Sequence, residues 1–236
     1  MNIIEIDGWD RVEDALIKLS TQRPEWFPNG FKGIHAIANR NLFAGTLGGR
    51  LYFSDADTMV AGFRPATALK NALLNIEAGK ALVFNEEYAI ETLWHEMLHG
   101  MSGIQAAKIP IGKDAIEEGL IQSVSRLTYT RLIDQLGGQA AHQHGIVMNG
   151  FAYAQTARNF CEMYRRAGID SDWLLDIVVG SGHTWKPALA DALSKGLNIR
   201  LDRVQSLYRH ASEKKLRSFV EKIALLIRNA PRNNRE

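Results

Sequence analysis

Two histidines and a glutamate occupy the segment His95-Glu96-Met97-Leu98-His99 with a spacing that suits metal chemistry. On an α-helix, residues four positions apart lie on one face, so His95 and His99 can present two imidazole nitrogens to a single metal ion. Glu96 lies beside them, where a carboxylate can take a proton from a metal-bound water. The segment therefore predicts a zinc hydrolase in which Glu96 is the general base.

Catalytic zinc normally takes three protein ligands, so two histidines leave the site one ligand short. A third histidine in the pattern HExxHxxGxxH would require glycine and histidine where the chain has Ser102 and Gln105. A glutamate on a following helix is the other common solution, and Glu118 lies nineteen positions after the second histidine. Its neighbour Glu117 is an alternative ligand, and both acidic residues would also suit the N-terminus of a helix.

An HExxH segment followed by Glu118-Gly119-Leu120 resembles the gluzincin metallopeptidases, including their aminopeptidase-like and minimal members. The resemblance covers roughly residues 84–130. It implies that His95, His99 and Glu118 bind zinc and that Glu96 is the general base. The Gly-x-Met-Glu-Asn segment, with which the aminopeptidase members hold a free amino terminus, has no counterpart here. Endopeptidase activity is therefore expected rather than exopeptidase activity.

Peptide hydrolysis also needs a hydrogen-bond donor for the oxyanion that develops on the attacked carbonyl. In the gluzincins a tyrosine or histidine from the second lobe typically supplies it, and the candidates here are Tyr153 and the Gly-flanked His183. Each has a plainer interpretation, Tyr153 as a core or interface aromatic and His183 as a loop residue. His142 and His144, two positions apart in a polar segment, could bind adventitious metal.

Two structural alternatives compete with the catalytic interpretation. The two histidines could be satisfied residues on a polar helix face, or the site could be the remnant of a metal centre that now serves as a scaffold. The intact Glu96 argues against a remnant. Gln122, one turn after Glu118, could orient a metal ligand or could face solvent.

The composition is that of an ordinary globular protein, since 46% of the 236 residues are hydrophobic and 23% are charged. This length suffices for one large domain or two lobes on a shared core. The single cysteine, Cys161, excludes an intramolecular disulfide and a Cys-rich zinc site. The N-terminus has no basic segment before an apolar core, and no run approaches the length of a membrane span. We therefore expect a cytoplasmic protein with no membrane partner.

Charge differs between the two halves of the chain. Residues 1–118 carry 11 basic and 16 acidic side chains, whereas residues 119–236 carry 17 basic and 10 acidic ones. A basic half could dock on nucleic acid or on an acidic partner. The charges are dispersed and no basic run is interleaved with aromatic residues. Solvated helix faces explain them better, so nucleic acid is not an expected partner, and the oligomeric state is left open.

Hydrophobic periodicity predicts the elements that would position these residues. In the first half we expect a helix over 9–20, strands over 34–38 and 50–54 joined by a turn-rich segment over 45–49, a helix over 66–78, a third strand over 81–84, and the helix of the two histidines with Asn85 as its N-cap. A long helix with Asp114 as N-cap is expected to run to about residue 136 and to carry Glu118. Further helices are expected over 150–167, 173–179, 187–195, 202–210 and 213–228.

These expectations describe an α+β, zincin-like protein with a small N-terminal sheet, an active-site helix and a mainly helical C-terminal lobe. Residues 1–140 would form the catalytic lobe, and residues 141–236 the helical lobe that completes the cleft. The expected function is hydrolysis of a peptide or protein substrate with one Zn²⁺ per chain. The alternatives are a zinc hydrolase of a non-peptide amide, and a non-enzymatic or inactive protein that binds nucleic acid or a larger assembly through its basic half.

Overall fold

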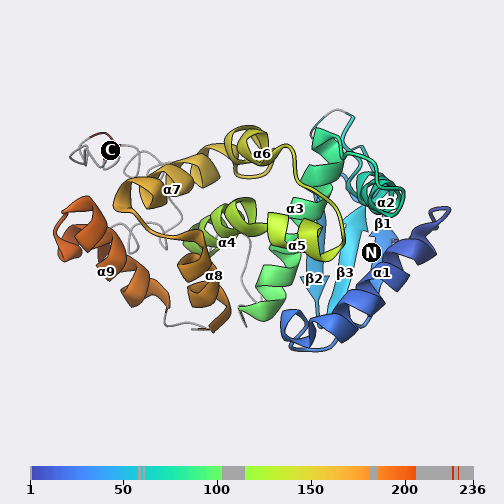
Figure 1. Cartoon of the computed structure of the whole chain (residues 1–236), viewed down its shortest axis with the longest axis horizontal. Helices are drawn as coiled ribbons and strands as arrows, with labels where there is room; N and C mark the ends of the chain where they lie inside the picture. Colours follow the sequence, from blue (N-terminus) through green and yellow to red (C-terminus); the bar gives the residue numbers. More distant parts are fainter. Residues whose placement is uncertain are drawn as a thin grey trace. The chain divides into compact units, whose positions relative to one another are not determined.

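The computed structural model describes residues 2–57, 60, 62–102, 115–180, 185–205, 225 and 228, and these form an α+β structure (Figure 1). Internal contacts divide the described residues into two units. The first unit comprises the described parts of 1–107 with 128–146, and the second comprises those of 108–127 with 147–236. No helix in the described ranges is long and apolar enough to cross a bilayer.

The first unit contains a three-stranded sheet of strands β1 (Ile34–Ile37), β2 (Ala44–Leu47) and β3 (Arg50–Ser54). The strand order is β1-β3-β2, with β1 parallel and β2 antiparallel to β3. Strands β1 and β3 lie where they were predicted. Strand β2 replaces the first part of the expected turn-rich segment. The turn itself is only Gly48 and Gly49, whose φ angles of 60° and 87° suit a two-residue hairpin loop.

The helices of the first unit are α1 (Trp9–Gln22), the 3₁₀ turn η1 (Pro24–Trp26), α2 (Pro65–Glu77), α3 (Phe84–Met101) and α5 (Thr130–Gln135). Helix α2 packs on α3 and β3, α1 packs on α2 and β1, and α3 runs beside β2 (Figure 1). Almost every side chain of α3 is buried, including charged ones. The helix that carries the two histidines is therefore the central helix of this unit.

The start of α3 corrects two predictions. Residues 81–83 have no regular structure and Phe84 begins the helix, so the expected third strand is wrong. The N-cap is Val83 rather than Asn85, because the Glu86 carboxylate accepts the Val83 backbone N–H at 3.0 Å. This hydrogen bond satisfies a backbone donor that would otherwise be free before the first turn.

The long helix expected to run to about residue 136 is also corrected, because it is interrupted at Tyr129. Helix α4 (Ala115–Thr128) ends there and α5 follows. The Thr128 hydroxyl accepts the indole N–H of Trp94 at 2.9 Å, and the Tyr129 hydroxyl donates to the Glu87 carboxylate. Both partners belong to α3, so contacts with α3 hold the break. The expected N-cap Asp114 lies outside the described residues.

The second unit is helical, with α4, α7 (Ala154–Ala167), α8 (Ser171–Gly180) and α9 (Trp185–Leu197). Helices α7 and α9 cross closely, since a Cβ at Gly196 would lie 2.1 Å from the carbonyl oxygen of Ala167. Helix α6 (Gln143–Asn149) forms in the polar segment of His144, where no helix was expected. Residues 201–205 are helical, at the start of the expected helix over 202–210, whose remainder lies outside the described residues. Of the helix expected over 213–228, only residues 225 and 228 are described.

Candidate metal centre

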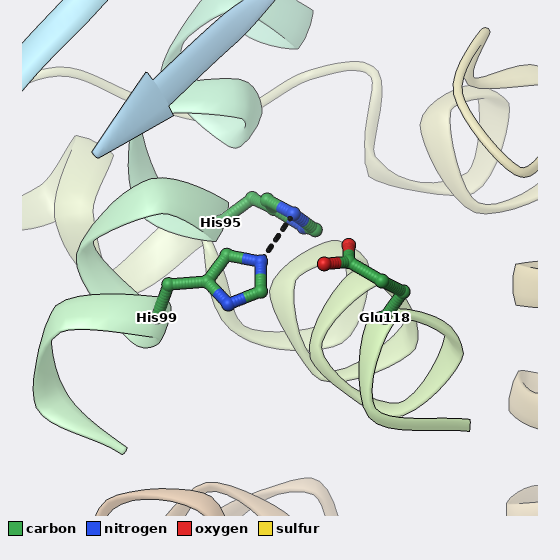
Figure 2. Close-up of side chains that lie close together, drawn as sticks. All are labelled: His95, His99 and Glu118. Atoms are coloured by element: carbon green, nitrogen blue, oxygen red, sulfur yellow. Dashed lines mark hydrogen bonds between the residues drawn. The ribbon is translucent and has the colours of Figure 1, made fainter. Parts of the chain in front are cut away.

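His95 and His99 lie on one face of α3 and are buried, with 7% and 5% of their surface exposed. Their Nε2 atoms are 3.0 Å apart, and the rings meet edge to face (Figure 2). This spacing serves a hydrogen bond when one ring carries a proton on Nε2. It also suits two ligands of one metal ion that replaces that proton.

Glu118 of α4 completes the group. One ligand atom from each of His95, His99 and Glu118 lies within 4.8 Å of the other two, and the carboxylate points toward the imidazoles (Figure 2). A tetrahedral zinc ion with bonds of about 2.1 Å holds its ligand atoms about 3.4 Å apart. The histidine pair, at 3.0 Å, is close to this spacing, and the Glu118 carboxylate lies within 4.8 Å of both histidines. The group could therefore hold a metal ion.

The donor set restricts which metals suit the group. Two imidazoles and one carboxylate match the His₂Glu set of catalytic zinc sites, in which a fourth position is open to water or substrate. Imidazole nitrogens also suit copper, iron and nickel. The residues thus fit zinc without excluding other transition metals.

The position of Glu118 depends on its neighbour Gly119. A Cβ at Gly119 would lie 2.8 Å from Cε2 of Phe160 and 3.1 Å from Cγ2 of Thr156, both on α7. Only glycine lets α7 approach α4 this closely. The Glu118-Gly119 pair is part of the resemblance to the gluzincins. In this chain the glycine of that pair is also explained by the packing of α4 against α7.

Three further polar residues of the sequence analysis lie in or near this region. Glu96 follows His95 on α3 and is 8% exposed, so its carboxylate is largely withdrawn from bulk water. Gln122 is buried as well, which rules out the solvent-facing interpretation. The side chain of Glu117 lies outside the described residues. Glu118 is identified as the third member of the candidate metal group because its own carboxylate lies close to His95 and His99.

Tyr153 occupies the position before α7 and is 44% exposed, which excludes a role as a core aromatic. Its backbone is left-handed, with φ 49° and ψ 30°. His183 lies outside the described residues. His142 is engaged elsewhere, because its Nε2 is 3.2 Å from the carbonyl oxygen of Leu82.

Sequence reasoning missed Glu87, a fully buried carboxylate on α3 two turns before His95. It accepts the backbone N–H groups of Ala141 at 2.9 Å and His142 at 3.0 Å, as well as the Tyr129 hydroxyl. Burial, and then the hydrogen bond to Glu87, raise the pKa of Tyr129, so its hydroxyl remains a neutral donor. The sequence does not distinguish Glu87, because the same helix also carries Glu86, Glu91 and Glu96.

Arg126 was missed as well. Its side chain is fully buried near the C-terminus of α4 and donates to the backbone carbonyl oxygens of Val147 and Ala152. An arginine at the end of a helix more often faces solvent, where it favours the negative end of the helix dipole. Nothing in the local sequence distinguishes this buried arginine from an exposed one.

Comparison with known proteins adds no assignment. No protein family matches the chain. No curated protein and no solved structure matches it either. The function is therefore argued from the geometry of the site.

Proposed function

We propose that this protein is a zinc-dependent metallopeptidase of zincin-like fold, with His95, His99 and Glu118 as ligands and Glu96 as general base. The observation that supports this most is the third group. Two histidines on a polar helix face would not require a carboxylate from another helix to point at them. The His₂Glu set with an adjacent glutamate is the combination that metal-assisted hydrolysis needs.

Each residue has a distinct role in this proposal. Zinc bound to the three ligands would supply a Lewis acid that polarises the peptide carbonyl and lowers the pKa of a water molecule. Glu96 takes the proton from the attacking water and passes it to the leaving amine. Tyr153, a partly exposed residue directly before α7, supplies the hydroxyl that donates to the oxyanion on the carbonyl oxygen.

An edge strand supports a peptide as the substrate. Strand β2 pairs with β3 on one side, and no described strand pairs with its other edge. The same strand runs beside α3, which carries the two histidines. An extended peptide can add to such an edge through backbone hydrogen bonds, whereas a small amide cannot. Endopeptidase action is proposed because the segment with which the aminopeptidase members hold a free amino terminus has no counterpart in this chain.

The metal centre is tested by metal analysis of untagged protein prepared without chelator. We expect about one zinc per wild-type chain and its loss in His99→Ala and Glu118→Ala, because each variant leaves only two of the three protein ligands that a catalytic zinc normally takes. His144→Ala is the matched control, since His144 is exposed and outside the group, and it is expected to keep the metal. A wild-type protein that takes up no zinc after repletion would refute the proposal.

Activity is tested by cleavage of quenched fluorescent peptides with Glu96→Gln at full zinc occupancy. Loss of a general base is expected to slow cleavage by about 10²–10⁴-fold. Cleavage as fast as wild type would contradict the role of Glu96. Activity confined to non-peptide amides in a substrate panel would favour the other hydrolase. Salt-dependent nucleic acid binding that is indifferent to zinc removal, without cleavage, would favour the binding protein.

A further inference from the structure

Arg126 is a buried cation that the proposed chemistry does not use. Its side chain is fully buried on α4. Nη1 donates to the carbonyl oxygen of Val147 at 3.3 Å and Nη2 to that of Ala152 at 2.5 Å, whereas Nε is buried without a hydrogen-bond partner among the described residues. Burial of a guanidinium is costly. One hydrogen bond goes to the last turn of α6, at Val147, and the other to the connection between α6 and α7, at Ala152.

Tyr153 follows directly after the residue that Arg126 holds. Its left-handed backbone is unfavourable for a residue with a Cβ, and a bulky side chain rarely adopts it. Its carbonyl oxygen accepts the N–H of Ala157 at 2.8 Å, which is the hydrogen bond that opens α7. Such a conformation persists only where the surroundings hold it in place. The anchored carbonyl of Ala152 on one side and the first turn of α7 on the other do so here.

The same helix pair carries Glu118. Helix α7 contacts α4 at Gly119, and Sγ of Cys161 lies 3.8 Å from the carbonyl oxygen of Ser123. Arg126 makes a further contact about two turns along α4 from Glu118. The two helices are thus in contact near Gly119 and near Cys161, and Arg126 ties the residue before Tyr153 to the helix that carries Glu118.

We infer that Arg126 is a positioning residue for the reaction, an inference that rests on the proposed metallopeptidase function. It holds Ala152 so that Tyr153 takes its left-handed conformation and presents its hydroxyl to the substrate at a fixed place relative to Glu118. Arg126 itself touches neither the metal nor the peptide and acts through Tyr153. Lysine cannot replace it, because a single ammonium group lacks the planar fork that reaches two separate carbonyl oxygens.

The inference is tested by comparing Arg126→Lys, Tyr153→Phe and the double variant on a peptide that wild type cleaves. We expect kcat to fall by about 10²-fold in each single variant, with KM and zinc content near wild type, since one oxyanion donor contributes about that much. The double variant is expected to be no slower than Tyr153→Phe, because both changes remove the same interaction. Arg131→Lys, at an exposed arginine of α5, is the matched control and is expected to change neither constant. Losses that multiply in the double variant would overturn the inference.

A second measurement does not depend on activity. Hydrogen exchange at the amide of Ala157 is expected to rise at least about tenfold in Arg126→Lys, because the first turn of α7 loses its anchor. The amide of Leu174, which donates to Asp170 at the start of α8, is expected to be unaffected. Unchanged exchange at Ala157 in folded Arg126→Lys would overturn the positioning role alone. Zinc-loaded wild type that cleaves no peptide would overturn the proposed function, and with it any role of Arg126 in turnover.

Discussion

Two glycines that follow residues of the candidate metal group allow the packing at the site to be separated from helix propensity. Gly100 follows His99 on α3, and Gly119 follows Glu118 on α4. A Cβ at Gly100 would meet no atom within 4 Å, whereas one at Gly119 would lie 2.8 Å from Phe160. Alanine favours a helix over glycine by about 1 kcal/mol at either position. The difference between the two alanine variants therefore isolates the packing at Gly119.

The size of this difference follows from the neighbours of Gly119. Phe160 is fully buried and Thr156 nearly so, and neither can turn into solvent. Ordinary contact begins at 3.4 Å, so α7 must retreat by about 0.6 Å. Overpacking of this kind costs about 1–3 kcal/mol. We expect Gly100→Ala to raise the free energy of unfolding by up to about 1 kcal/mol, and Gly119→Ala to lower it by about 0–2 kcal/mol.

The measurement is urea unfolding of both variants with metal chelated, so that ligand binding does not add to stability. The midpoints are expected to separate at unchanged m-values, which would show that the compactness of the unfolded state is not the cause. The retreat of α7 also frees Glu118 to shift, so zinc affinity in a chelator competition is expected to weaken in Gly119→Ala but not in Gly100→Ala. Equal stability of the two variants would refute the packing argument.

Three further changes test other parts of the structure. Glu87→Gln weakens a buried acceptor of two backbone N–H groups and a tyrosine hydroxyl, and is expected to cost about 1–3 kcal/mol in urea unfolding; a loss within error would contradict this role. The hydrogen bond from Arg165 lowers the pKa of Glu162 from 4.5 to about 2. Because the pKa is lower in the folded state, this stabilisation is present above pH 4.5 and is lost as the pH falls to 2. Wild type is therefore expected to be more stable than Glu162→Gln above pH 4.5, by at most about 1 kcal/mol because the pair is partly exposed. This difference in stability is expected to close between pH 4.5 and pH 2. Tyr153→Gly relieves a left-handed backbone and is expected to raise stability in a thermal melt by about 1 kcal/mol, whereas Asn198→Gly, at φ 52°, is expected to gain only a few tenths because asparagine tolerates this region.

Elements with a strong local pattern were predicted within a few residues, among them α1, α2 and strands β1 and β3. Strand β2 was missed because Ala44 and Gly45 have little strand propensity of their own. It is a strand because β3 pairs with it across a tight Gly-Gly turn. The apolar residues 81–83 show the opposite case. They have the composition of a strand, but the cap of α3 forms next to them and no strand pairs with them in the described structure.

The interruption at Tyr129 also depends on contacts distant in the sequence. Residues 115–135 have continuous helical periodicity, and no glycine or proline marks a break at 129. The break is held by Trp94 and Glu87, which lie more than thirty residues earlier in the chain. A local pattern cannot report such partners.

In the candidate site too, some features follow from the local sequence and others depend on contacts distant in the chain. The sequence by itself determined that His95 and His99 share a face, because the 3.6-residue period of a helix is a local property. It could name Glu118 as a third ligand only from spacing, and spacing along the chain does not determine how two helices pack. The tertiary structure decided that the carboxylate points at the imidazoles, that Gly119 seats α4 against α7, and that a buried arginine anchors the residue before Tyr153. Backbone periodicity sets which residues share a face, but which faces meet depends on the packing of side chains that lie far apart in the chain.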